Sequence, residues 1–321
     1  VSEPVSTWDA NEWTIEAADV ADMTPTSHTS GVILVLTGDD GFRLLSNNQG
    51  TSFADLLDPL WTQGIGTGAD VTDGSPNVFT WNKSTDVWDG VSDLNNTPAA
   101  GTGFLTFVFS DDDFDGNAEG FPKTLSLSGS ENSGAITPPV NSDANGFTLL
   151  GNPYASTIDF DDLTLSDPND FTGVVYAWDP NDGSGDGGSP SGLSGSWKTW
   201  NSSAGDLTNG LIAPFQGFFI ENDGTVGTPS VTIEEADKKP GGTFLGKKND
   251  PLAVRLEIVN SELKLNNSTW LSFIDNGSPS ERVRGDALKL KSLNGKFVQL
   301  ATTKAGEQTL LDINQLPVAF E

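Results

Sequence analysis

Residues 41–45, Gly-Phe-Arg-Leu-Leu, return at 146–150 as Gly-Phe-Thr-Leu-Leu. Four further segments return in the same order: Val78–Trp81 as Val175–Trp178, Asp93–Leu94 as Asp206–Leu207, Gly103–Leu105 as Gly217–Phe219, and Thr124–Leu127 as Ser230–Ile233. Because matched segments in one order mark repeated folding units, the sequence predicts that one module is present twice.

The offset between matched segments varies from about 97 to about 113 residues and then returns to its starting value. Loops tolerate such changes in length because their backbone is solvated, so the insertions are expected in loops while the matched pieces keep their register. The largest differences fall at 111–120 in the first copy and 179–196 in the second.

Short apolar runs separated by Gly, Pro, Asn, Asp and Ser run through the chain, which has 36 Gly and 18 Pro. This pattern is typical of an all-β protein with many turns. We expect strands at 32–36, 104–109, 174–178, 217–220 and 231–233. The best helical segment is Ser52–Leu60, where Ser52 can cap and Phe53, Leu56, Leu57 and Leu60 share a face.

In the last part of the chain, Val254, Leu256 and Ile258 alternate with Arg255 and Glu257. Alternation of this kind predicts a strand with one buried face and one wet face. The expected fold is therefore all-β, with two homologous β-sandwich-like modules in tandem and a C-terminal β-sandwich resembling a jelly roll. The expected boundaries are 1–37 for an N-terminal strand segment, 38–137 and 138–237 for the two modules, 238–243 for a linker and 244–321 for the C-terminal domain.

The formal net charge is −29, and it is unevenly distributed. Residues 1–237 hold four basic and 36 acidic side chains, whereas residues 238–321 hold twelve basic and nine acidic ones. An acidic body repels nucleic acid and anionic membranes and attracts cations, so neither nucleic acid nor a membrane surface is an expected partner. No run of 18 apolar residues is present, so we expect no membrane span. The chain has no cysteine, which excludes disulfides and thiolate metal sites.

The stretch 111–119, Asp-Asp-Asp-Phe-Asp-Gly-Asn-Ala-Glu, places Asp111, Asp113 and Asp115 at alternate positions before a glycine. Calcium takes six to eight oxygen ligands, and alternating carboxylates around a glycine turn can wrap such an ion. We expect a calcium site formed by Asp111, Asp113, Asp115, Asn117 and Glu119. The twelfth position is Pro122 rather than the glutamate of a helix-loop-helix calcium hand, and the flanks are predicted strands. The alternative is a solvated acidic turn.

A second acidic stretch, 179–186, has looser spacing and is interpreted as a flexible loop with a weaker case for ion binding. Nine tryptophans are present. Trp81 and Trp178 match across the copies and are expected in the core, because matched aromatic residues in repeats usually pack. Trp88, Trp197 and Trp200 lie in turn-rich segments and are candidate ligand-binding residues that could stack on sugar rings.

Catalysis has little support in the sequence. The only histidine is His28, which a Ser-His-Asp triad would have to use and which has no obvious partner nearby. A hydrolase that uses two carboxylates is a third alternative, since the chain has 45 acidic residues. It is the weakest one, because nothing in the sequence singles out a catalytic pair. The chain is therefore not expected to be an enzyme.

Two pairs of segments resemble cell-surface proteins of the Bacteroidota that are exported by the type IX secretion system. They are 151–160 (GNPYASTIDF) with 213–219 (APFQGFF), and 285–290 (GDALKL) with 311–317 (LDINQLP). In that family such segments belong to β-rich modules upstream of a C-terminal sorting domain. The chain departs from the pattern because no sorting domain follows Leu316–Glu321, which indicates a truncated or processed chain. The resemblance implies export to the cell surface or medium and no particular substrate.

These observations lead to the hypothesis of an extracellular structural or adhesive surface protein, a repeating subunit of a fibre or sheath that calcium stabilises. Its expected partners are further copies of itself or other surface proteins. The alternative is a carbohydrate-binding module protein of a secreted polysaccharide-degrading system, with glycans as partners.

Overall fold

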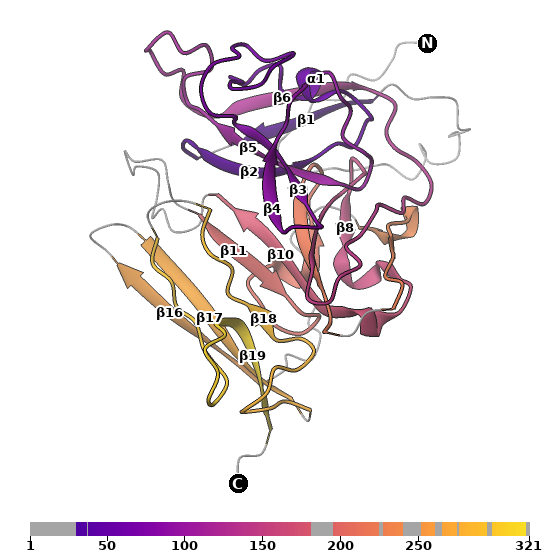
Figure 1. Ribbon diagram of the computed structural model, residues 1–321, viewed down its shortest axis with the longest axis vertical. Helices are drawn as coiled ribbons and strands as arrows, with labels where there is room; N and C mark the ends of the chain where they lie inside the picture. Colours follow the sequence, from indigo (N-terminus) through magenta and orange to yellow (C-terminus); the bar gives the residue numbers. More distant parts are fainter. Residues whose placement is uncertain are drawn as a thin grey trace, which may run out of the picture.

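The computed structural model describes residues 30–36, 38–180, 195–224, 227–239, 252–260, 265–274, 276–293 and 297–318. These residues form three four-stranded sheets and several smaller ones, with a single short α-helix, so the predicted all-β class is confirmed. In Figure 1 the first sheet lies at the top, the second in the middle and the C-terminal sheet at the lower left.

The first sheet contains, in order across the sheet, β2 (Gly41–Ser46), β5 (Gly103–Val108), β3 (Val78–Asn82) and β4 (Val87–Gly90). The second sheet contains, in order, β7 (Phe147–Gly151), β13 (Gly217–Asn222), β10 (Phe171–Asp179) and β11 (Ser196–Trp200). When strands that contain matching segments are treated as equivalent, the two sheets have the same strand order. A duplicated module would produce this correspondence.

The remaining elements of these two parts are β1 (Ser30–Leu36), α1 (Phe53–Leu57), β6 (Lys123–Gly129), β8 (Thr157–Asp159), η2 (Phe160–Asp162), β9 (Thr164–Leu165), η3 (Pro168–Asp170), η4 (Thr208–Gly210), β12 (Leu211–Ile212), β14 (Val231–Thr232), η5 (Glu235–Asp237) and β15 (Lys238–Lys239). The helix α1 begins as predicted, because the Ser52 hydroxyl accepts a hydrogen bond from the Asp55 N–H at 3.0 Å. Its Phe53, Leu56 and Leu57 are buried.

The correspondence between the two sheets extends to individual residue pairs. Leu45 lies opposite Phe104 in the first sheet, and Leu150 lies opposite Phe218 in the second. Trp81 lies opposite Trp88, and Trp178 lies opposite Trp197. Trp88 and Trp197 are therefore equivalent positions, a match that the sequence comparison missed because it lies beside the long 179–196 insertion.

The two sheets also contact each other reciprocally. The Ser46 N–H donates to the Phe215 carbonyl at 2.8 Å, and the equivalent Gly151 N–H donates to the Gly101 carbonyl at 2.9 Å. A Cβ atom on Gly103 would lie 2.6 Å from the Leu150 carbonyl oxygen, and one on the equivalent Gly217 would lie 3.0 Å from that of Leu45. The same patch of each copy thus meets the other copy, as at a two-fold interface between subunits.

The core explains why the sheets stay together. One cluster under the first sheet contains α1, and a second lies under the second sheet with Tyr154, Ile158 and Phe160. The third joins all three sheets: it includes Leu44 from the first, Leu149 and Phe219 from the second, and Ile313 from the C-terminal sheet. Burying a side chain of this size contributes about 1.5–3 kcal/mol, so this shared cluster ties the sheets into one unit.

Asn152 shows why two of the distinctive segments occur together. Its side-chain amide donates to the carbonyls of Ile212 and Ala213, both at 3.1 Å, and to that of Ser156 at 2.8 Å. Its oxygen accepts from the Tyr154 N–H at 2.9 Å. Asn152 is fully buried. An apolar residue in its place would leave these backbone groups without hydrogen-bond partners. The Asn152 side chain therefore holds the 151–160 and 213–219 segments side by side.

The strands that end the two predicted modules pair differently. Strand β1 pairs antiparallel with β6 over all seven residues, from Ser30 opposite Gly129 to Leu36 opposite Lys123. The N-terminal strand at 30–36 thus completes the first copy of the same chain. In the second copy, the strand equivalent to β6 is β14, and it pairs with β9 from within that copy.

The C-terminal sheet contains, in order, β16 (Leu252–Asn260), β17 (Leu265–Ile274), β19 (Leu311–Pro317) and β18 (Ala287–Leu288). Strands β17 and β19 are parallel. The described residues of this part form a single sheet, whereas the predicted jelly roll has two. This sheet packs instead against the second sheet, through the core cluster that the sheets share. The expected linker 238–243 also begins too early, because Lys238 and Lys239 form β15 and pair with β8.

One strand departs from its expected burial. Val254, Leu256 and Ile258 of β16 were expected on a buried face, yet they are 44, 40 and 40 % exposed. The alternation correctly indicates a strand, but it cannot say whether anything covers the apolar face.

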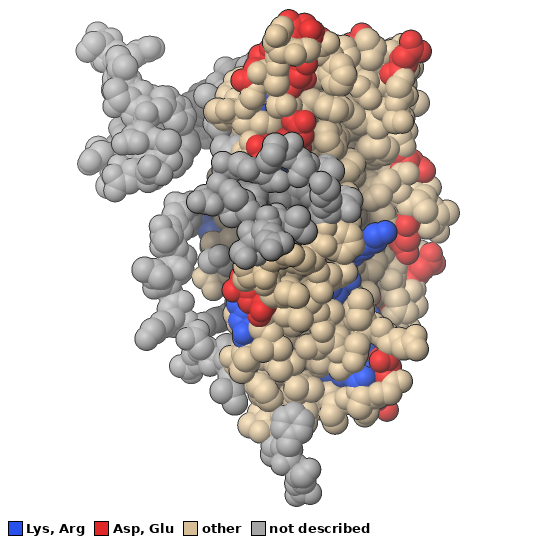
Figure 2. Space-filling model, turned by 90° about the vertical axis from the view of Figure 1, so that its left-hand side faces the viewer, with Lys and Arg blue, Asp and Glu red and all other residues tan. Residues whose placement is uncertain are grey.

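The uneven charge of the sequence is visible on one face of the molecule (Figure 2). On the face shown in Figure 2 the upper part carries acidic side chains and almost no basic ones, whereas basic side chains lie in the middle and lower parts.

Candidate functional site

The acidic loop Asp111–Glu119 connects β5 to β6 at the outer end of the first sheet. Its turn needs two residues in the left-handed region, Phe114 with φ 59° and Gly116 with φ 93°. Glycine adopts this conformation without steric cost, while phenylalanine does so rarely. Asp111 holds the turn, because its carboxylate accepts from the N–H groups of Phe114 at 2.6 Å and Gly116 at 3.1 Å.

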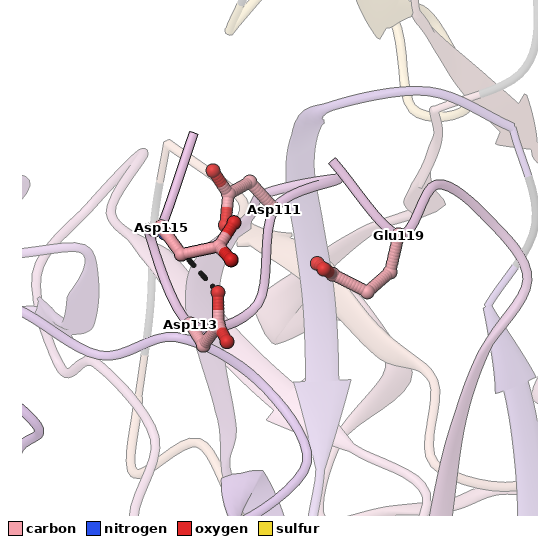
Figure 3. Close-up of side chains that lie close together, drawn as sticks. All are labelled: Asp111, Asp113, Asp115 and Glu119. Atoms are coloured by element: carbon pink, nitrogen blue, oxygen red, sulfur yellow. Dashed lines mark hydrogen bonds between the residues drawn. The ribbon is translucent and has the colours of Figure 1, made fainter. Parts of the chain in front are cut away.

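Four of the five predicted ligands come together in this loop. Asp111, Asp113, Asp115 and Glu119 each offer a carboxylate oxygen, and these oxygens all lie within 4.8 Å of one another. Figure 3 shows the three aspartates on one side, with Glu119 pointing towards them from the returning limb of the loop. The fifth residue, Asn117, lies beside the cluster and donates to Asp115 from its backbone N–H at 2.8 Å and its amide at 3.2 Å.

The electrostatics of the cluster favour a cation. Like charges about 4 Å apart repel by about 1 kcal/mol per pair even in bulk water. Lys123, which follows the loop in the sequence, forms its ion pair with Asp112 at 2.6 Å, outside the four. Among the described residues, no lysine or arginine forms an ion pair with the four carboxylates. Hard oxygen donors in this number match the ligands of calcium.

Aromatic side chains anchor the loop to the first sheet. Phe114 stacks on Trp61 with ring centroids 5.1 Å apart, and it meets Phe109 edge to face at 5.3 Å. The Ser110 N–H also donates to Asp40 at 2.5 Å. Phe114 is nevertheless 52 % exposed. The spacing of the acidic residues does not predict this role of Trp61 and Phe114; the signal in the sequence is a phenylalanine inside an otherwise polar loop.

The three candidate ligand-binding tryptophans are packed. Trp197 is 7 % exposed, contacts Trp178 and Phe219, and donates from its indole N–H to the Lys291 carbonyl at 3.0 Å. Its interpretation as an exposed stacking residue is therefore wrong. Trp178 is buried as predicted.

The two other tryptophans are half-buried. Trp88 meets Trp81 edge to face at 5.1 Å and also contacts Phe219. Trp200 packs against the core of the second sheet, and its indole N–H donates to Asp161 at 3.1 Å. Each uses part of its ring surface within the fold, so the observation that motivated glycan binding is weakened.

A cavity of about 340 Å³ lies beside the end of β10, lined by Trp178, Asp179, Lys198, Asp206 and other residues. Pro180 also lines it, and the residues that follow, 181–194, lie outside the described residues. Most of the second acidic stretch, 181–186, and the single histidine His28 also lie outside the described residues.

Buried polar contacts join the C-terminal part of the chain to the second sheet, and no local pattern in the sequence marks them. Arg282 donates to both carboxylate oxygens of Glu221, at 3.0 and 2.6 Å, and the Glu221 side chain is 1 % exposed. Burial raises the pKa of Glu221, and the bonds and charge of Arg282 oppose that rise. The adjacent Tyr176 hydroxyl is fully buried, and burial raises the pKa of Tyr176 well above its usual value.

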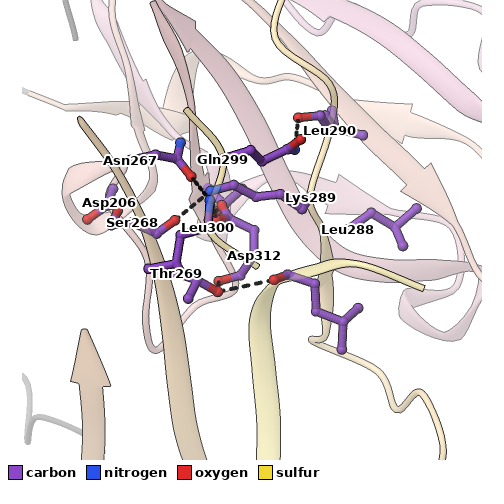
Figure 4. A network of polar contacts seen from close by, with 12 residues as sticks. Asp206, Asn267, Ser268, Thr269, Leu288, Lys289, Leu290, Gln299, Leu300 and Asp312 are labelled. Carbon is purple, nitrogen blue, oxygen red and sulfur yellow. Dashed lines mark hydrogen bonds and ion pairs between the residues drawn. The ribbon is translucent and has the colours of Figure 1, made fainter. Parts of the chain in front are cut away.

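A second pair lies in the polar network of Figure 4. Lys289 contacts Asp312 at 2.5 Å with both side chains less than a tenth exposed, and Asp312 accepts from Thr199 of β11 at 2.7 Å. Burial raises the pKa of Asp312, and the charge of Lys289 opposes that rise. These contacts hold the two sheets in one fixed arrangement.

Comparisons of the chain with known protein families, with curated proteins and with solved structures found no match. Within the described residues, no helix is both long enough and apolar enough to cross a bilayer.

Proposed function

We propose that this chain is an extracellular structural or adhesive surface protein, a self-associating subunit of a fibre or sheath that calcium stabilises. The resemblance to exported Bacteroidota surface proteins supports the location. The reciprocal packing of the two similar sheets carries the structural part of the proposal. Their facing surfaces are filled with aromatic and aliphatic side chains, so the copies form a rigid body whose loops and strand edges meet the surroundings.

Calcium is proposed for the loop between β5 and β6. Asp111, Asp113, Asp115 and Glu119 would supply carboxylate oxygens, and Asn117 would complete the set from its place beside them. A bound divalent cation would remove the repulsion among the carboxylates. It would also stiffen the loop between β5 and β6.

Removing calcium is expected to lower the melting temperature. A ligand at 100 times its dissociation constant adds about 2.7 kcal/mol to the free energy of unfolding, which corresponds to a shift on the order of 5 °C for a chain of this size. The measurement is a thermal melt of the purified protein in EGTA, followed by titration with calcium and, separately, magnesium.

The matched variants are Asp113→Asn with Asp115→Asn, and Asp73→Asn. The first pair keeps the shape of the loop and removes two ligand charges, whereas Asp73 is an exposed aspartate in another loop of the first copy. The calcium-induced rise should vanish in the double variant and persist in Asp73→Asn. An identical melt with and without calcium, in protein that contains no metal, would refute the calcium proposal.

Assembly is tested by electron microscopy and sedimentation of the chain at rising concentration with calcium present. We expect filaments or discrete larger particles, and less of them in EGTA. Monomers alone at every concentration would count against a fibre or sheath subunit.

Glycan binding stays a prediction from the sequence. It would gain support from binding on a glycan array that Trp200→Ala abolishes without changing the melting temperature.

A further inference from the structure

Strand β16 lies at the edge of the C-terminal sheet. It is nine residues long, and β17 is the single strand paired with it among the described residues. Figure 1 shows it at the outer left of the molecule. Edge strands present unpaired backbone N–H and C=O groups and so can template the pairing of another chain.

The two faces of β16 carry different side chains. Residues paired across neighbouring strands share a face, so Arg255, opposite Trp270, lies on the face that turns towards the second sheet. Its guanidinium reaches Asp206 at 3.0 Å. Val254, Leu256 and Ile258 lie on the opposite face and remain exposed. Over the lower part of the face in Figure 2, where this sheet lies, the surface is mostly uncharged.

The sequence of β16 is complementary to itself when reversed. In an antiparallel pair of two β16 strands centred on Leu256, Arg255 of each copy lies opposite Glu257 of the other. Val254 lies opposite Ile258, and Leu256 faces its own equivalent. Centring the pair on Arg255 or Glu257 instead would set like charges directly opposite each other, which destabilises a sheet.

We propose that β16 pairs antiparallel with β16 of a second copy, in the register centred on Leu256. The proposal rests on the self-association proposed above and names one of its interfaces. A two-fold contact of this kind joins the two C-terminal sheets into one continuous sheet. It places Leu256 against its equivalent and Val254 of each copy against Ile258 of the other.

Charge fixes the register. Within one chain Arg255 contacts Glu257 at 3.3 Å, and both side chains are about 40 % exposed. Across the two-fold axis each would meet the opposite charge of the second copy, so the four side chains alternate in sign. Electrostatic complementarity of this type selects the correct partner and register.

The test uses the full chain and two charge reversals. In Glu257→Arg, positions 255 and 257 are both basic; in Arg255→Glu, both are acidic. Each variant alone should repel its own copies and sediment as a monomer at concentrations where the parent is a dimer. Mixed in equal amounts, the two should restore a dimer, because every basic position then meets an acidic one. Thermal melts of each variant show whether the fold is kept.

The outcomes separate the interface from the function. If each single reversal self-associates as well as the parent chain, the interface lies elsewhere. The β16 pairing is then refuted, while self-association stands. A parent that is monomeric at all concentrations overturns both. If each reversal is monomeric alone and the equal mixture also stays monomeric, the proposed register is overturned.

Discussion

Replacing Arg282 with alanine is expected to lower the free energy of unfolding by about 3–5 kcal/mol, because it leaves a buried carboxylate without its partner. Glu221 is 1 % exposed and relies on both guanidinium nitrogens of Arg282. No other basic side chain contacts Glu221 among the described residues. Urea unfolding followed by tryptophan fluorescence measures the loss.

The pH dependence of the Arg282→Ala effect identifies its cause. Burial already raises the pKa of Glu221, and removing the arginine takes away the opposing contribution, so the pKa rises further. A carboxyl whose pKa is raised in the folded state favours folding when it is protonated, and this benefit is lost as the pH rises through that pKa. The difference between variant and parent should therefore shrink as the pH falls from about 7 towards about 5.

Two controls accompany this experiment. Replacing both partners, Glu221→Leu with Arg282→Met, should cost less than Arg282→Ala alone, because no charge is then buried. Lys239→Ala removes an exposed ion pair with Asp162 and should leave stability nearly unchanged. A loss below about 1 kcal/mol for Arg282→Ala would mean that water reaches Glu221 and that the two sheets are not tightly joined there.

Local patterns in the sequence were sufficient for much of the fold. Short apolar runs between turn-forming residues located strands such as β10 and β13, and the Ser52 cap with its spaced apolar residues located α1. The acidic loop could also be predicted, because its four carboxylates lie within nine consecutive residues and a turn alone brings them together.

Contacts between distant parts of the chain could not be predicted in the same way. Arg282 and Glu221 are 61 residues apart, and nothing near either residue marks the other as its partner. The exposed face of β16 has the same alternation as a buried one. The reciprocal contacts of Gly103 and Gly217 depend on two backbones meeting, which a single sequence does not encode as a local pattern.

Trp197 illustrates how a repeat can correct an interpretation. Its neighbours are rich in turn-forming residues, which favoured a surface position. Its equivalent by register is Trp88, opposite Trp81, just as Trp197 is opposite Trp178. Both tryptophans meet Phe219, at 5.9 and 5.8 Å, from opposite copies. They are paired elements of the shared core.

Replacing Trp197 with alanine is accordingly expected to cost about 3–5 kcal/mol, as deletion of a large buried aromatic side chain does. Trp88→Ala is the matched comparison: it sits at the equivalent position but is half-buried, so its loss should be smaller. Chemical unfolding of both variants measures the difference, and a glycan array read in parallel separates packing from binding. If Trp197→Ala kept the stability of the parent while a glycan signal disappeared, Trp197 would be a binding residue and the shared core would need revision.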